Sequence, residues 1–192
     1  MSAMPAVHAI FAAALASAAL SSAAADHYTI DPMHTYPSLE FSHMGISVWR
    51  GKFNRSSGKV VLDRAARTGT VDVRVETASI DFGLDKMNDF ARTADWLDVA
   101  KHPAMTYEGN IRFAGDRPSR VEGQLTLRGV TRPVALAIKS FGCIPHPLTK
   151  REVCGADAEG DLNRADFGMT LYSEGEAGRI HLRIQVEANR DD

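Results

Sequence analysis

The chain shows no excess of charge of either sign. Its 22 Lys and Arg residues nearly balance its 24 Asp and Glu residues, so the formal net charge is −2. The two signs are interspersed along the chain, which is typical of a solvated outer surface. This balance gives no electrostatic reason to expect binding to nucleic acid.

Residues 26–192 also lack an apolar run long enough to span a bilayer, so we expect no stable membrane span there. Residues 1–25 differ, because about half of them are alanine and none is Asp, Glu, Lys or Arg. They end in the small residues Ser21–Ala25, a pattern typical of signal-peptide cleavage sites. We expect a secretory signal peptide over residues 1–25, in preference to a membrane anchor. The mature domain, residues 26–192, would then be periplasmic or secreted.

Cysteine is scarce, with only Cys143 and Cys154 present. The ten residues between them include Pro145 and Pro147, which favour a hairpin end. In an exported protein such a pair is typically a disulfide. A metal site would need two further ligands, and only His146 is near. We therefore predict a disulfide and no metal.

Motifs of hydrolases, zinc enzymes and nucleotide-binding proteins are missing. The sequence contains no G-x-S-x-G, no H-E-x-x-H, no H-x-H and no glycine-rich phosphate loop. His34 and His43 are nine residues apart, which places them on opposite faces of a regular strand. We therefore do not expect an enzyme, and we expect no cofactor. A metal-dependent or hydrolytic lipid-modifying enzyme that uses His34 and His43 is the alternative.

What the sequence does contain is a recurrent strand pattern. In the stretch 69–82, Val71, Val73 and Val75 alternate with charged residues, which predicts a strand with one buried face. Similar alternation is found in the segments 39–43, 48–53, 58–63, 105–113, 121–127, 134–138, 167–171 and 180–186. Glycine-containing turns separate most of them. We expect about eight to ten short antiparallel strands.

One segment has helical spacing instead. Over residues 85–97 the apolar residues Met87, Phe90, Ala91, Ala94 and Leu97 recur at intervals of one helical turn. A single amphipathic helix in an all-β chain typically lies across a barrel mouth or a sandwich edge. The strands bury their apolar faces either in a second sheet or in one closed sheet, and closure removes exposed edges. Aromatic residues make up only 7 % of the chain, and composition leaves open whether the interior is filled or hollow.

A set of short motifs, in this order, carries a resemblance to a known family: Tyr28-x-Ile30-Asp31-x-x-His34-Thr35, Phe41-x-His43-Met44-Gly45, Gly51-x-Phe53, Asp95-Trp96-Leu97-Asp98-Val99-x-Lys101-His102-Pro103, Gly123-x-Leu125-Thr126-x-Arg128-Gly129-Val130-Thr131-x-Pro133, and Asn163-Arg164-x-Asp166-Phe167-Gly168-Met169. The chain resembles the YceI-like family of periplasmic polyisoprenoid-binding proteins. This resemblance implies a lipocalin-like antiparallel barrel of about eight strands, with one short amphipathic helix near a barrel mouth. It also implies an apolar lumen that holds a prenyl or fatty chain.

The helix departs from the family pattern. Met87, Asn88, Phe90 and Ala91 stand where the family usually has an Arg-Asp…His-Leu arrangement. If the polar residues of the family contact a ligand headgroup, this chain replaces that contact with a more apolar one.

On this resemblance we expect an exported binding or carrier protein that encloses a long apolar chain, such as a polyisoprenoid or a quinone tail. The expected lumen-lining residues are Phe41, Val73, Val75, Phe82, Phe90, Met105, Tyr107, Leu125, Leu136, Phe167 and Met169. His43 is expected near the lumen mouth. Arg164 is expected either to form an ion pair, with Asp166 or Asp98, or to meet a diphosphate headgroup. A ligand-free, stress-related interaction domain is a further alternative, and a homodimer would fit a barrel with an open flank.

Overall fold

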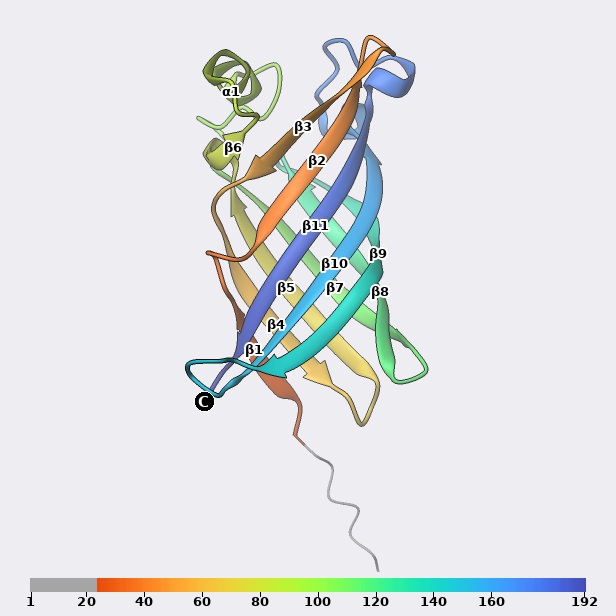
Figure 1. Ribbon diagram of the computed structural model, residues 1–192. Helices are drawn as coiled ribbons and strands as arrows, with labels where there is room; N and C mark the ends of the chain where they lie inside the picture. Colours follow the sequence, from red (N-terminus) through yellow and green to blue (C-terminus); the bar gives the residue numbers. More distant parts are fainter. Residues whose placement is uncertain (1–23) are drawn as a thin grey trace, which may run out of the picture.

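The computed structural model describes residues 24–192, which form one antiparallel sheet and one α-helix (Figure 1). The residues of the predicted signal peptide lie almost entirely outside this range. The strands are β1 (Asp26–Ile30), β2 (Tyr36–His43), β3 (Ser47–Phe53), β4 (Ser56–Asp63), β5 (Thr68–Glu76), β6 (Ile80–Asp81), β7 (Ala104–Ala114), β8 (Arg117–Leu127), β9 (Val130–Pro145), β10 (Glu152–Asn163) and β11 (Arg179–Arg190).

The sheet closes on itself. The strand order β1-β4-β5-β7-β8-β9-β10-β11 forms a ring of eight strands, because β1 also pairs with β11. Strand β11 pairs with β1 through residues 188–190 and with β2 through residues 181–185, so β1 and β2 are two parts of one interrupted strand. Strands β3 and β4, and β5 and β6, are related in the same way. The predicted eight-stranded antiparallel barrel is confirmed.

Buried side-chain hydroxyls form hydrogen bonds with backbone groups where these strands are interrupted. Thr35 Oγ1 donates to the Glu187 carbonyl at 3.1 Å and accepts from the Glu187 N–H at 3.1 Å. The Ser56 hydroxyl donates to the Thr35 carbonyl at 3.2 Å, and the Thr77 hydroxyl donates to the His102 carbonyl at 2.6 Å. The barrel therefore bends at these points without leaving buried polar groups unpaired.

Helix α1 (Asp85–Arg92) lies at the end of the barrel opposite the C-terminus (Figure 1). We call this the upper end, and the end that holds the C-terminus the lower end. Asn88 fixes the helix, because its side-chain oxygen accepts from the Phe82 N–H at 2.7 Å and its amide donates to Asp81 at 3.1 Å. The predicted helix extended to residue 97. It ends at Arg92 because Thr93 is extended and its hydroxyl binds the Phe90 carbonyl at 2.8 Å.

One predicted strand is absent from the structure, and two observed strands were not predicted. The predicted strand 167–171 is wrong: residues Arg164–Phe167 form a 3₁₀ turn that ends at Gly168, whose φ is +80°. Strand β10 and the short strand β1 were not predicted from the sequence pattern. Alternate residues of β10 are Cys154, Ala156, Ala158, Gly160 and Leu162. Most of these side chains are small, so the strand lacks the bulky alternation that identifies a buried face.

Among residues 24–192, no helix has the length and apolar character needed to cross a bilayer.

Candidate functional site

The barrel is hollow. Its interior contains a cavity of about 230 Å³, lined by residues from all eight strands of the ring. A smaller engineered apolar cavity, of about 150 Å³, takes up benzene or xenon. On β11 the lining extends from Ile180 to Ala188. Those eight steps cover roughly 27 Å of strand, or roughly 20 Å along a barrel axis to which strands are inclined by about 40°. The cavity is long enough for an extended chain.

Small side chains on one wall create this space. Cys154, Ala156 and Ala158 of β10 line the cavity opposite the larger side chains of the other strands. Tyr107 reaches into the interior from β7 and packs over Gly123, where an added Cβ would lie 2.3 Å from the tyrosine ring. The Tyr107 hydroxyl donates to the Val134 carbonyl at 2.9 Å, and burial raises its pKa. This hydroxyl is therefore already satisfied within the protein.

The predicted lining residues divide into two groups. Seven lie on the cavity wall, namely Val73, Val75, Met105, Tyr107, Leu125, Leu136 and Met169. The other four do not: Phe41, Phe82 and Phe90 lie in an aromatic cluster, and Phe167 is buried beside the cavity. The lining residues on β1, β2, β4, β10 and β11, and Trp96, were not predicted from the sequence. That any of these residues contacts a ligand stays a prediction.

The aromatic cluster lies at the upper end and joins strands β2 and β3 and the end of β6 to helix α1 and the segment after it. Its five rings are Phe41, Trp49, Phe82, Phe90 and Trp96, with neighbouring centroids 5.3–6.5 Å apart. The His43 ring packs against Trp49 at 5.5 Å. Trp96 belongs to both the cluster and the cavity wall. The cluster is therefore the lid at this end of the cavity.

Arg164 is buried at the upper end, with 3 % of its surface exposed. Its guanidinium donates to the Ala177 and Met169 carbonyls, each at 3.2 Å, and to the Tyr172 carbonyl. It also lies over the Trp96 ring, 5.1 Å from the centroid. Burial lowers the pKa of Arg164.

The expected ion pair of Arg164 is therefore a wrong prediction. Within residues 24–192, no carboxylate forms a salt bridge with Arg164, and Asp98 pairs with Lys101 instead, at 3.3 Å. Arg164 organises the loop 164–178 through backbone carbonyls. Arg164 also lines the cavity, and these bonds use three of the five N–H groups of its guanidinium.

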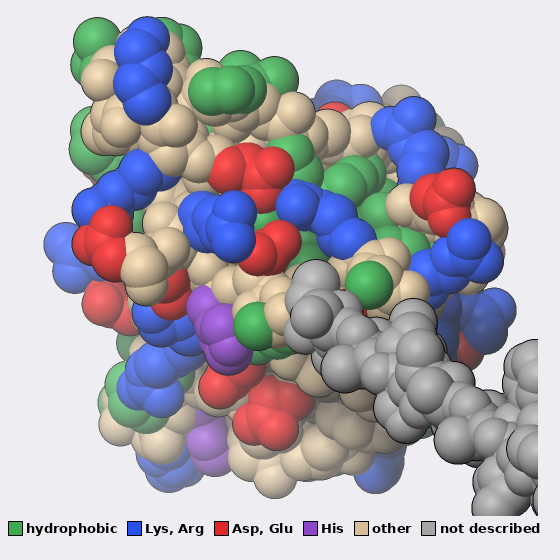
Figure 2. All heavy atoms as spheres, turned by 90° about the horizontal axis from the view of Figure 1, so that it is seen from below, with side chains coloured by type: hydrophobic (Ala, Val, Ile, Leu, Met, Phe, Trp, Pro, Cys, Tyr) green, Lys and Arg blue, Asp and Glu red, His purple; other side chains and the backbone are tan. Residues whose placement is uncertain are grey.

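The lower end is closed by charged and polar groups. The Tyr28 hydroxyl donates to Glu152 at 2.5 Å, and Arg64 donates to both Tyr28 and Glu152 at 2.8 Å. Asp26 pairs with Arg64 at 3.2 Å and with Arg190 at 2.5 Å. Burial and the bond to Glu152 raise the pKa of Tyr28 to about 12. Acidic and basic side chains lie side by side across this end (Figure 2).

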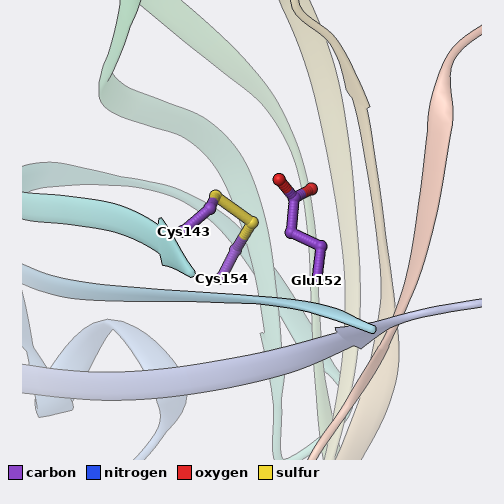
Figure 3. Close-up of side chains that lie close together, drawn as sticks. All are labelled: Cys143, Glu152 and Cys154. Carbon is purple, nitrogen blue, oxygen red and sulfur yellow. A yellow bond between two sulfur atoms is a disulfide. The ribbon is translucent and has the colours of Figure 1, made fainter. Parts of the chain in front are cut away.

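The predicted disulfide between Cys143 and Cys154 is confirmed and also lies at the lower end. The two cysteines face each other directly across the pair of strands β9 and β10 (Figure 3). Arg64 Nη2 lies 3.3 Å from the Cys143 sulfur and 3.4 Å from the Cys154 sulfur. His146 is the nearest further metal ligand along the sequence, whereas in the structure Glu152 lies beside the two sulfurs.

His34 and His43 do not form the metal site of the alternative hypothesis. His34 lies at the interruption between β1 and β2, where its Nδ1 is 2.9 Å from Asp31 and its side chain is 58 % exposed. Hydrogen bonding to Asp31 raises the pKa of His34. In the described part of the chain, the one group of three metal-ligating side chains consists of Cys143, Glu152 and Cys154.

Comparison with known proteins supplies relatives of similar length. A UPF0312 protein of Ectopseudomonas mendocina is 35 % identical over 188 residues, which cover 95 % of this chain and 98 % of the relative. A UPF0312 protein of Azotobacter vinelandii is 32 % identical over 93 % of this chain and 96 % of the relative. Protein YceI of Salmonella arizonae is 31 % identical, with 86 % and 88 % covered.

Solved structures share the fold at lower identity. The YCEI protein of Campylobacter jejuni superposes with a TM-score of 0.67 at 24 % identity, covering 79 % of this chain and 90 % of the other. BcnA of Burkholderia cenocepacia gives a TM-score of 0.66 at 22 % identity, with 82 % and 98 % covered. A polyisoprenoid binding domain from Saccharophagus degradans superposes with a TM-score of 0.60 at 14 % identity. The superposition covers 85 % of this chain and 98 % of that domain. The family model described as YceI-like domain matches residues 28–189. As its motifs predicted, the chain belongs to the YceI-like family.

Proposed function

We propose that this protein is an exported binding or carrier protein that holds one long apolar chain, such as a polyisoprenoid or a quinone tail, inside its barrel. The observation that carries the proposal is the long interior cavity, whose wall is almost entirely apolar. Its tyrosine hydroxyls, on Tyr28 and Tyr107, are bound to other protein groups. A hydrocarbon ligand would therefore bind without displacing a hydrogen bond of the wall.

The apolar cavity also provides enough free energy for binding. Burial of each CH₂ group contributes roughly 0.8 kcal/mol, so ten carbons would contribute roughly 8 kcal/mol before the cost of association. One structural neighbour, the Saccharophagus degradans domain, is described as polyisoprenoid binding. That description supports a chain of this chemical class as the ligand.

We expect the polar head of the ligand at the upper end. The charged groups of the lower end are paired with one another, whereas Arg164 lines the cavity and forms no salt bridge with a carboxylate of residues 24–192. His43 packs against Trp49 of the aromatic cluster and is exposed to solvent. A headgroup with acceptor oxygens would bind Arg164, with the tail directed toward β10 residues at the lower end.

Export is supported by two features of the sequence. Residues 1–25 have the composition of a signal peptide, and Cys143 and Cys154 form a disulfide, which is typical of proteins outside the cytosol. Cell fractionation of the tagged chain would place it in the periplasm or the medium if this expectation holds.

A pair of matched variants tests the cavity. Ala158 lines the cavity from β10, whereas Ala137 is exposed on the neighbouring strand β9. Ala158→Phe fills the interior, and Ala137→Phe adds the same ring on the outside. Native mass spectrometry of gently purified protein should show a lipid adduct for the wild type and Ala137→Phe, and lose most of it for Ala158→Phe.

Delipidated protein provides the second measurement. Titration with a C₂₀ prenyl alcohol should restore the adduct in the wild type and change the tryptophan emission, because Trp96 lies at the cavity wall. If Ala158→Phe fails to fold, the milder Ala156→Val serves the same purpose. Absence of any adduct in the wild type, both after purification and after titration, would refute the proposal.

A further inference from the structure

Strand geometry brings three metal-ligating side chains together at the lower end. Glu152 and Cys154 are two residues apart on β10 and therefore lie on the same face of the strand. Cys143 is the direct partner of Cys154 on β9. The two sulfur atoms and a carboxylate oxygen of Glu152 lie within 4.8 Å of one another (Figure 3). None of these contacts belongs to the ligand site proposed above, apart from Cys154 at the cavity wall.

A cation already occupies the centre of this group. One guanidinium nitrogen of Arg64 lies 2.8 Å from Glu152, 2.8 Å from the Tyr28 hydroxyl, and 3.3 and 3.4 Å from the two sulfurs. The side chain of Arg64 is 40 % exposed, so it has a path to solvent. The group is thus arranged around a position that accommodates positive charge.

We propose that reduction of the Cys143–Cys154 disulfide creates a binding site for one thiophilic divalent cation of the zinc class, held by the two thiolates and Glu152. A dithiol reductant supplies the two electrons and two protons that convert the disulfide to two thiols, and is itself oxidised to a disulfide. Binding of the metal then releases both thiol protons to solvent. The site is absent from the oxidised protein because a disulfide has no thiolate.

Geometry and charge both favour this ligand set. With zinc–sulfur bonds of about 2.3 Å, a tetrahedral site places two sulfurs roughly 3.8 Å apart, a spacing that directly paired residues of neighbouring strands reach. Two thiolates add two negative charges to a network in which Glu152 and Asp26 are already balanced by Arg64 and Arg190. A divalent cation neutralises those added charges. Thiolate ligands select zinc-like ions over magnesium or calcium.

Zinc itself is the probe for the test. The full mature chain is reduced with a phosphine, exposed to zinc in competition with a chromogenic chelator, desalted and analysed for metal. We expect one zinc ion per reduced chain and none per oxidised chain, with unchanged circular dichroism in both states. Equal zinc binding by the two states, or no binding by the folded reduced chain, would overturn the proposal.

Three variants identify the ligands. Glu152→Gln should weaken zinc binding by about tenfold or more, since even residues that only support a ligand contribute that much. Arg64→Met should tighten binding, because it removes the competing cation from the centre of the site. His146→Ala is the control, since His146 lies in the adjacent loop but outside the group. Loss of binding in His146→Ala with no effect of Glu152→Gln would refute the proposed ligand set.

Discussion

The two ends of the barrel close the same cavity by different means. At the lower end, charged pairs around Arg64 and a disulfide close the interior. At the upper end, five aromatic rings form the lid, and the deeply buried Arg164 is bound to backbone carbonyls rather than to a carboxylate. The lower end therefore depends on pH and redox state, and the upper end depends on the packing of side chains.

The largest effect should come from removing the central ring of the upper end. Trp96 is 7 % exposed and contacts Phe41, Phe82 and Phe90. We expect Trp96→Ala to lower the free energy of unfolding by about 3–5 kcal/mol, the usual cost of a cavity of this size. Urea denaturation measures the change. A loss below about 1 kcal/mol would mean that the cluster does not support the upper end.

Reduction of the disulfide should have the next largest effect, and it acts on the lower end. The two cysteines are separated by 11 positions, so the loop-entropy model gives a loss of roughly 3 kcal/mol. Denaturation in urea, with and without a phosphine reductant and with chelator present, measures this loss. The double variant Cys143→Ser with Cys154→Ser is the control and should not respond to the reductant.

Alkaline pH should also weaken the lower end. Tyr28 has a pKa of about 12 in the folded protein and 10.0 as its ordinary value, so the unfolded chain loses this proton first as pH rises. The stabilisation is complete below pH 10 and is lost between pH 10 and 12. We expect a loss of roughly 2–3 kcal/mol over that range.

The control for this titration is Tyr28→Phe. The variant should lack the Tyr28 part of the alkaline loss and keep the part due to Tyr107, whose pKa is also raised by burial. An identical pH profile in wild type and Tyr28→Phe would show that Tyr28 does not couple the lower end to pH.

The sequence predicted the ring of strands because bulky residues alternate with polar ones in most of them. Val71, Val73 and Val75 of β5 are an example, and each of them lines the cavity. The prediction failed at β10, where Cys154, Ala156 and Ala158 face the interior. Small residues carry little periodic signal, and the same small residues make the cavity. The feature that produces the site is therefore the one that the pattern does not reveal.

Aromatic residues misled the prediction for a different reason. Phe41, Phe82 and Phe90 have the size and spacing of lining residues, but they pack against one another at the upper end. That arrangement depends on β2, β3 and the end of β6 meeting helix α1 and the segment after it, which are contacts between distant parts of the chain. Glu152 was missed for the same reason, since its position beside the sulfurs depends on how β10 pairs with β9.

The row of small side chains on β10 would link the thermal stability of this protein to the binding of the proposed apolar ligand. The atoms that line an empty cavity lack van der Waals partners on one side. The empty barrel is therefore less stable than a filled barrel of the same shape. A ligand whose free concentration is a hundred times its dissociation constant would raise the free energy of unfolding by about 2.7 kcal/mol. The melting temperature of protein taken directly from cells should therefore report how many barrels are loaded.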